Sequence, residues 1–196
     1  EMGFRTLMAL LYGSLFRRPV WVWWGGTIHS VKAHNFVRHM IRKIFVHWTR
    51  NWISYGETST EYLMSIGVRR DQILQTQCCV DNRLFSPDTP PLFSDLKKPV
   101  LLHSGQIIKR KGCDLFFKAA KKAQDTGRDF TILMVGGGEE KESLQKLEQD
   151  LGLKNVVWAR ECRPEEMPGV YTSADAVIFP TIEDVWGLVA NEAILS

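Results

Sequence analysis

Apolar runs that end at or near glycine or proline alternate with amphipathic stretches along the second half of the chain. The apolar runs lie at 99–105, 130–138, 155–159 and 175–181. The amphipathic stretches between and after them lie at 115–127, 139–152, 164–174 and 187–196. Runs that are apolar throughout are typical of strands covered on both faces. Strands that alternate with helices over short connections predict an α/β fold, an open parallel sheet with helices on both sides.

The first half has a less regular pattern. A helix is expected at 4–16, a strand at 19–24, a basic helix at roughly 33–48 and another helix at 58–66. Apolar runs at 52–56 and 73–77 complete this half, and the second of them could be one more strand. The proline-rich segment 86–98 is interpreted as a linker. It separates an expected partial amino-terminal domain, 1–85, from a partial carboxy-terminal domain, 99–196.

Composition excludes several classes of protein. The 196 residues are 44% hydrophobic and 24% charged, which excludes disorder, collagen-like repeats and coiled coil. The longest nearly apolar run, 6–16, falls short of the about 20 residues of a spanning helix, so no membrane span is expected. A signal peptide is not expected either, because Glu1 stands where its basic region would be.

The four cysteines indicate a reduced, cytoplasmic protein. They form no Cys-x-x-Cys pair and have no histidine at ligand spacing, so no zinc site is expected. We interpret them as small buried hydrophobic residues. They are Cys78, Cys79, Cys113 and Cys162.

Charge is distributed unevenly. Residues 1–98 carry 13 lysines and arginines against 7 acids, a net +6, and residues 99–196 carry 12 against 15, a net −3. The halves are therefore expected to meet different partners. Segment 32–52 mixes basic and aromatic residues, which fits a helix on an anionic membrane surface or a helix packed on the core with a basic outer face. No nucleic-acid recognition motif is present.

Glycine turns follow the predicted strands of the second half. They are GQIIKRKG (105–112), GGGE (136–139) and TIEDVWG (181–187), the last leading into a helix near Leu188. The carboxyl ends of parallel strands meet at one edge, where ligands of open α/β sheets bind. Backbone N–H groups and helix N-termini favour phosphate there, and the cations of the first turn add charge-assisted contacts.

The order of GQIIKRKG, MVGGGEE, NVVWA and YTSADAVIFPTIEDVWGLVANEA resembles the carboxy-terminal domain of retaining glycosyltransferases of family 4. The resemblance covers about 99–196 and reaches more loosely into 23–30 and 53–63. It implies the GT-B fold of two Rossmann-like domains, with this chain as a fragment truncated at both ends. The most specific block is an acid, seven residues and a glutamate, with an aromatic-Gly-Leu between: Asp184, Trp186-Gly187-Leu188 and Glu192.

The resemblance also implies site residues. Lys111 matches the lysine that holds the donor diphosphate, and the backbone N–H groups of Gly187 and Leu188 would bind the same phosphates. Glu192 matches the acid that binds ribose, and Asp184 the acid that contacts the transferred sugar. Catalytic roles fall to Lys111, Asp184 and His29, which matches a histidine facing that sugar. Gly105, Gln106 and Gly137 complete the implied donor site.

Three positions depart from the family pattern. The family commonly has glutamate at Asp184, so the adjacent Glu183 is an alternative first acid. It often has arginine at Gln106, a charge that Lys109 or Arg110 could supply. Arg160 stands where glycine is usual, and we expect it to border the base pocket.

The predicted function is metal-independent, retaining transfer of a sugar from a UDP, GDP or ADP sugar to a polysaccharide or lipid-linked acceptor. No Asp-x-Asp pair is present to hold a metal, and no cofactor is expected. The site would lie in the cytoplasm, with peripheral contact to the inner membrane face through 32–52. The alternative is a non-catalytic nucleotide-sugar-binding module. A nucleotide-sugar epimerase or dehydrogenase would need a dinucleotide fingerprint that 105–112 lacks.

Overall fold

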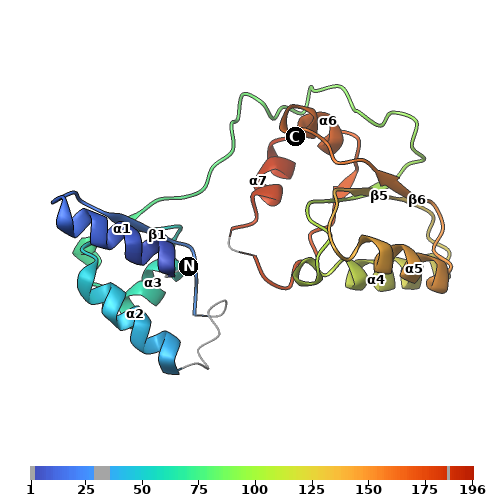
Figure 1. Cartoon of the computed structure of the whole chain (residues 1–196). Coiled ribbons are helices and arrows are strands. Elements are labelled where there is room, and N and C mark those ends of the chain that lie inside the picture. Colours follow the sequence, from blue (N-terminus) through green and yellow to red (C-terminus); the bar gives the residue numbers. More distant parts are fainter. Residues whose placement is uncertain (1–2, 29–35, 185) are drawn as a thin grey trace. The chain divides into compact units, whose positions relative to one another are not determined.

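The computed structural model describes residues 3–28, 36–184 and 186–196. It divides the chain into two compact units, Glu1–Cys78 and Cys79–Ser196 (Figure 1). Over the described stretches, no helix is both long enough and apolar enough to cross a membrane.

The first unit is built on three parallel strands in the order β1-β2-β3. The strands are β1 (Trp21–Trp24), β2 (Asn51–Ser54) and β3 (Ile73–Gln75). Its helices are α1 (Phe4–Leu15), α2 (Phe36–Trp48), α3 (Glu57–Ser65) and the 3₁₀ turn η1 (Arg70–Gln72). The third strand, which the pattern left open, is therefore present.

Tryptophan side chains dominate the core of the first unit. Trp52 is fully buried, and the ring of Trp24 stacks on Tyr62 of α3 with centroids 5.7 Å apart. Helix α2 buries Phe45, as a helix packed on the core would. Its outer face is not simply basic, because apolar side chains are exposed beside Lys43 and His47. These exposed apolar residues are Met40, Ile41, Ile44 and Trp48.

The second unit contains four parallel strands in the order β6-β5-β4-β7. They are β4 (Val100–Ser104), β5 (Thr131–Val135), β6 (Val156–Ala159) and β7 (Ala176–Val177). The helices are α4 (Cys113–Asp125), α5 (Lys141–Leu151), α6 (Met167–Tyr171) and α7 (Leu188–Leu195), with 3₁₀ turns η2 (Lys109–Lys111) and η3 (Pro164–Glu166). The expected α/β fold with parallel sheets is confirmed.

Both faces of this second sheet are covered. Ile132 and Met134 of β5 pack toward α4 and α5, which lie next to each other in Figure 1. Leu133 and Val135, the alternate residues, pack on the other face with Tyr171 of α6. Burial of each large apolar side chain stabilises the fold by about 1.5–3 kcal/mol. Because helices cover both faces of the sheet, both sets of alternating side chains of β5 gain this stabilisation, which explains why the strand has no solvent-facing polar side.

Strand β7 is shorter than the pattern predicts, two residues rather than the run 175–181. One further bond, from the N–H of Ile178 to the carbonyl of Leu102 (2.7 Å), extends the pairing. Pro180 has no N–H to donate, so the chain leaves the sheet there. The released residues 179–184 lie outside the sheet, and residues 186–187 directly precede α7.

The proline-rich segment makes contacts within the second unit. The N–H of Leu92 donates to the carbonyl of Gly169 (2.7 Å), and that of Phe93 donates to Ser173 Oγ (2.9 Å). Phe93 and Leu96 also pack against the core. The compact units divide at Cys78, and the placement of the domain boundary in 86–98 stays a prediction.

Candidate functional site

The turns that follow β4 and β5 are bonded to each other at the carboxyl edge of the second sheet. The N–H of Ile107 donates to the carbonyl of Gly137 (2.8 Å), and the carbonyl of Ile107 accepts from Glu140 (3.0 Å). Gly136 has φ +129°, and an added Cβ would overlap the carbonyl oxygen of Gly105. Glycine is therefore required for this main-chain approach.

These turns border an open cavity of about 510 Å³, within the range of small-molecule sites. It brings together Gly105, Gln106 and Gly137, three of the predicted donor-binding residues. Glu161, Cys162 and Met167 line its other side. The cavity has the size and the glycine-rich wall that a nucleotide needs.

Lys111 and Asp184 form an ion pair although 73 residues separate them. Lys111 Nζ lies 2.5 Å from Asp184 Oδ2, and the side chains are only 13% and 20% exposed. The ammonium also lies 5.4 Å from the centre of the Phe179 ring. Arg110 reaches the same loop, donating to the carbonyl of Glu183 (3.1 Å). Of the two adjacent acids, Asp184 is the one whose carboxylate meets Lys111.

Main-chain contacts hold the loop 179–184 against the turn that carries Lys111. The N–H of Ile182 donates to the carbonyl of Arg110 (2.8 Å). Gly112 follows with φ +64°, and a Cβ there would overlap the carbonyl oxygen of Pro180. A glycine directly after Lys111 thus permits the contact that brings the two charged side chains together.

Helix α7 begins beside this loop. Gly187 directly precedes the helix and has φ +82°. The first N–H groups of α7 have no partner within the helix, and they belong to the segment that the resemblance assigns to the donor phosphates. Tyr171 Oη donates to Glu192 Oε2 at 2.6 Å. Burial and then this bond raise the pKa of Tyr171 above its ordinary range. Sequence reasoning missed Tyr171, whose only signal is its place before the last strand.

Arg160 lies at the end of β6 but does not line the cavity, which Glu161 and Cys162 reach instead. Its guanidinium is 62% exposed and bonds both carboxylate oxygens of Glu166 (2.5 and 2.9 Å). Those bonds, with one from the N–H of Arg163, lower the pKa of Glu166 to about 2. The expected border of the base pocket by Arg160 stays a prediction, and His29 lies outside the described residues.

Comparison with known proteins identifies the family. The profile of the glycosyl transferases group 1 matches residues 87–195, more than half of the chain. The chain belongs to this group 1 family. Aligned segments are 31% identical to the 2-deoxystreptamine glucosyltransferase of Streptomyces kanamyceticus over 99 residues, and 32% identical to the D-inositol 3-phosphate glycosyltransferase of Paenarthrobacter aurescens over 143 residues.

The chain spans a minor part of these group 1 relatives. The segments cover 50% and 68% of this chain, but only 26% and 35% of the two relatives. A crystal structure of Anabaena HepE in complex with UDP and glucose superposes with a TM-score of 0.76 at 19% identity, covering 97% of this chain and 54% of HepE. This likeness confirms the GT-B type of fold.

A buried histidine and cysteine lie behind the lysine turn of this group 1 domain. His103 Nε2 lies 3.2 Å from Cys113 Sγ, and His103 Nδ1 lies 3.4 Å from the carbonyl of Ile178. Burial lowers the pKa of His103 and raises that of Cys113 to about 11. Both groups are therefore neutral near pH 7. Their contact joins β4 to the start of α4, next to the turn that carries Lys111, without adding charge there. The interpretation of all four cysteines as small buried residues holds for Cys113, although it missed the contact with His103; it is wrong for Cys79, which is exposed, and Cys78 and Cys162 are only partly buried.

Candidate metal ligands do not cluster in residues 3–28, 36–184 and 186–196. These ranges contain no group of three or more histidine, cysteine, aspartate or glutamate side chains placed to hold an ion. The charged groups described at the carboxyl edge include Lys111, its partner Asp184, the neighbouring Arg110 and, in the cavity wall, Glu161.

Proposed function

We propose that the chain is part of a retaining glycosyltransferase of family 4, with the nucleotide-sugar donor held at the carboxyl edge of the second sheet. One observation carries this proposal. The Lys111–Asp184 pair joins the turn before α4 to the loop that leads into α7, at the same edge as the glycine-walled cavity. A cation, backbone N–H groups and an acid within one site match the diphosphate and the sugar of such a donor.

The residue roles follow from this geometry together with the resemblance. The ammonium of Lys111 exchanges Asp184 for the diphosphate and stabilises the charge that grows there as the sugar leaves. Asp184, released from Lys111, accepts bonds from hydroxyls of the transferred sugar. Glu192, held by Tyr171, accepts bonds from the ribose hydroxyls. Gly105, Gln106 and Gly137 form the wall of the base and ribose region.

Retention is proposed to occur by attack on the face from which the diphosphate leaves. The acceptor oxygen bonds to the anomeric carbon while the bond from that carbon to the phosphate oxygen breaks. The electron pair stays on the phosphate oxygen, which takes the acceptor proton. In this scheme Lys111 and the N-terminus of α7 stabilise the leaving group, so transfer is proposed to need no metal ion.

The printed names of relatives suggest donors and acceptors to test. HepE was crystallised with UDP and glucose, and one relative is named for D-inositol 3-phosphate. We propose a UDP, GDP or ADP sugar as donor and a glycan or lipid-linked acceptor in polysaccharide or glycolipid assembly. The base is proposed to enter the cavity beside Cys162 and Met167.

We also propose that α2 makes peripheral contact with an anionic membrane surface on the cytoplasmic side. The support is its outer face, where Met40, Ile44 and Trp48 are exposed at four-residue spacing beside Lys43. Ile44→Glu should abolish co-sedimentation of the full-length protein with anionic vesicles. Met64→Glu, which changes an equally apolar exposed residue of α3, should not. Equal binding of both variants would contradict this contact.

The decisive experiment uses the full-length protein, nucleotide thermal shift and sugar transfer. UDP, GDP or ADP should raise the melting temperature, and the preferred base names the donor class. Lys111→Ala should lower kcat by about 100-fold or more, the loss typical of a transition-state charge contact. Glu192→Ala should chiefly raise the donor KM.

Lys118→Ala is the matched control, because Lys118 pairs only with Asp114 on the surface of α4 among the described side chains. Full turnover in both Lys111→Ala and Glu192→Ala would refute the assigned roles. If the protein binds nucleotide but shows neither sugar transfer nor donor hydrolysis, the result would refute the proposed enzyme activity and support a non-catalytic nucleotide-sugar-binding module.

A further inference from the structure

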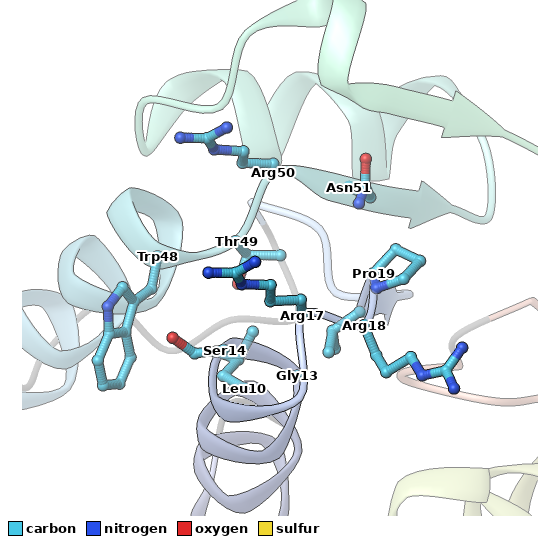
Figure 2. A pocket seen from close by; sticks show the side chains of 11 residues that line it. Leu10, Gly13, Ser14, Arg17, Arg18, Pro19, Trp48, Thr49, Arg50 and Asn51 are labelled. Carbon is cyan, nitrogen blue, oxygen red and sulfur yellow. The ribbon is translucent and has the colours of Figure 1, made fainter.

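The first unit contains a basic cavity of about 470 Å³ that the proposed transfer does not use. Figure 2 shows it between the end of α1, the end of α2 and the segments that enter the sheet. Polar side chains of six residues line it: Ser14, Arg17, Arg18, Thr49, Arg50 and Asn51.

Its position separates it from the edge where substrates of such sheets bind. Arg17 and Arg18 come just before β1, and Thr49 and Arg50 just before β2. The cavity therefore lies at the amino ends of these strands. Parallel sheets bind substrates beyond the carboxyl ends, which here follow Trp24 and Ser54. The cavity thus lies away from the edge at which this sheet would bind a substrate.

The arginines that line the cavity have no compensating acids among the described residues. In the described parts of the chain, no carboxylate pairs with Arg17, Arg18 or Arg50, and no acidic residue lines the cavity. Positive charge that no carboxylate neutralises attracts an anion to the cavity. Guanidinium groups are planar forks that match the oxygens of phosphate two at a time.

A buried hydroxyl provides the second, independent observation. Thr49 is only 1% exposed, and its Oγ1 has no hydrogen-bond partner among the residues that the structure describes. Its backbone is held on both sides, because its N–H donates to Phe45 (2.8 Å) and its carbonyl accepts from Trp52 Nε1 (3.2 Å). Buried hydroxyls are nearly always bonded, and Thr49 is one of the residues that line the cavity.

We propose that this cavity binds the phosphate group of a phosphate ester. Arg17 is its central contact, since Figure 2 shows its guanidinium and Thr49 facing the same hollow. The Thr49 hydroxyl donates to a phosphate oxygen, and Asn51 adds an amide donor at the start of β2. The volume exceeds that of a lone phosphate, and Trp48, 49% exposed, offers a flat face to a ring or chain attached to it.

The same chemistry has two sources, a soluble phosphate ester or the head group of an anionic phospholipid. Titration of the full-length protein with glycerol 1-phosphate tests the first source. Sedimentation with phosphatidylcholine vesicles, with and without phosphatidylglycerol, tests the second. Both are run in the Lys111→Ala background, so that the proposed diphosphate contact of the second unit does not contribute.

Two variants test the site itself. Arg17→Gln should weaken binding by about 10-fold or more, the usual effect of losing a charge-assisted contact. Thr49→Val keeps the shape and removes a hydroxyl that has no partner in the described chain, so it should weaken binding severalfold without lowering the melting temperature. Arg69→Gln, on the same unit and outside the cavity, is the control and should change neither.

Each outcome decides the proposal. Binding of glycerol 1-phosphate that Arg17→Gln and Thr49→Val weaken supports a soluble ester. Binding only to phosphatidylglycerol vesicles, weakened by the same variants, supports a lipid head group. Binding to neither probe, or binding that both variants leave unchanged, overturns the proposal. None of these outcomes depends on whether the second unit transfers a sugar.

Discussion

Tyr171→Phe removes the hydroxyl that holds Glu192 and leaves the rest of the buried ring in place. The bond is 2.6 Å long and joins a neutral donor to a carboxylate. Hydrogen bonds to charged groups contribute about 1.5–3 kcal/mol to stability. Glu192 is partly exposed, so water replaces part of the loss and about 1 kcal/mol is expected. For a unit of this size, that lowers the melting temperature by about 4 °C.

The same substitution should affect donor binding more than chemistry. A carboxylate that is no longer fixed loses about 0.5–1.5 kcal/mol on ordering, which is about 2- to 12-fold in the donor KM. The ribose is far from the breaking bond, so kcat should change little. Initial rates against donor concentration in the full-length protein measure both quantities. Tyr12→Phe, on the exposed face of α1, is the control.

A double-mutant cycle with Glu192→Gln separates a positioning role from a structural one. If Tyr171 acts through Glu192, the effects on KM will not add, because the second change removes what the first one orients. Additive effects, or a lower melting temperature with an unchanged KM, would refute the reasoning. The raised pKa of Tyr171 keeps it protonated at neutral pH. Its stabilisation is present below pH about 10, the ordinary tyrosine pKa, and is lost as pH rises above that value.

Three other predictions concern the glycine wall, an exposed ion pair and the thiols. Gly136→Ala should lower the free energy of unfolding in urea by about 3 kcal/mol or more, because the added Cβ would overlap a carbonyl oxygen. Gly152 also has a left-handed backbone but open space around it, so Gly152→Ala should lower the free energy of unfolding by only about 1 kcal/mol. Equal losses would contradict the overlap. Glu166 has a depressed pKa of about 2, so its contribution to stability is present at neutral pH and is lost as pH falls from about 4.5 toward 2. In Glu166→Gln, the free energy of unfolding, followed by circular dichroism, should therefore fall less steeply over this pH range. An unchanged slope would contradict this. Exposed Cys79 should react with a thiol reagent at neutral pH, whereas Cys113, buried with a pKa of about 11, should react only on unfolding; rapid labelling of both would contradict its burial.

The sequence predicted the second unit well because its signals are local. Strands β4, β5 and β6 lie inside the apolar runs that were assigned to them, and α7 begins after Gly187 as expected. These elements depend on neighbouring residues, namely apolar runs, helix periods and glycine stops. Strand β7 was predicted too long because apolar content was followed through Pro180, which cannot pair.

Contacts between distant segments could not be predicted in this way. The bond from Tyr171 to Glu192 and the pairing of His103 with Cys113 depend on how two helices pack on the sheet. That the Thr49 hydroxyl is buried without a partner can be seen only once the hydrogen bonds of the folded unit are known. No residue spacing contains this information, so the resemblance could match Glu192 but not the tyrosine that holds it.

The Lys111–Asp184 pair limits how a donor can enter the proposed site. Both side chains are largely buried, so neither is solvated well enough to be left alone. A ligand that took only Lys111 would leave Asp184 with its longer contact to Arg110, whose Nη1 lies 3.6 Å from Oδ1, and one that took only Asp184 would leave a largely buried ammonium. A diphosphate joined to a hydroxyl-bearing sugar offers an anion to the first and hydrogen-bond donors to the second. If the proposed site holds the donor, we expect the pair to bind the intact donor more tightly than its nucleotide half, because only the intact donor offers partners to both side chains.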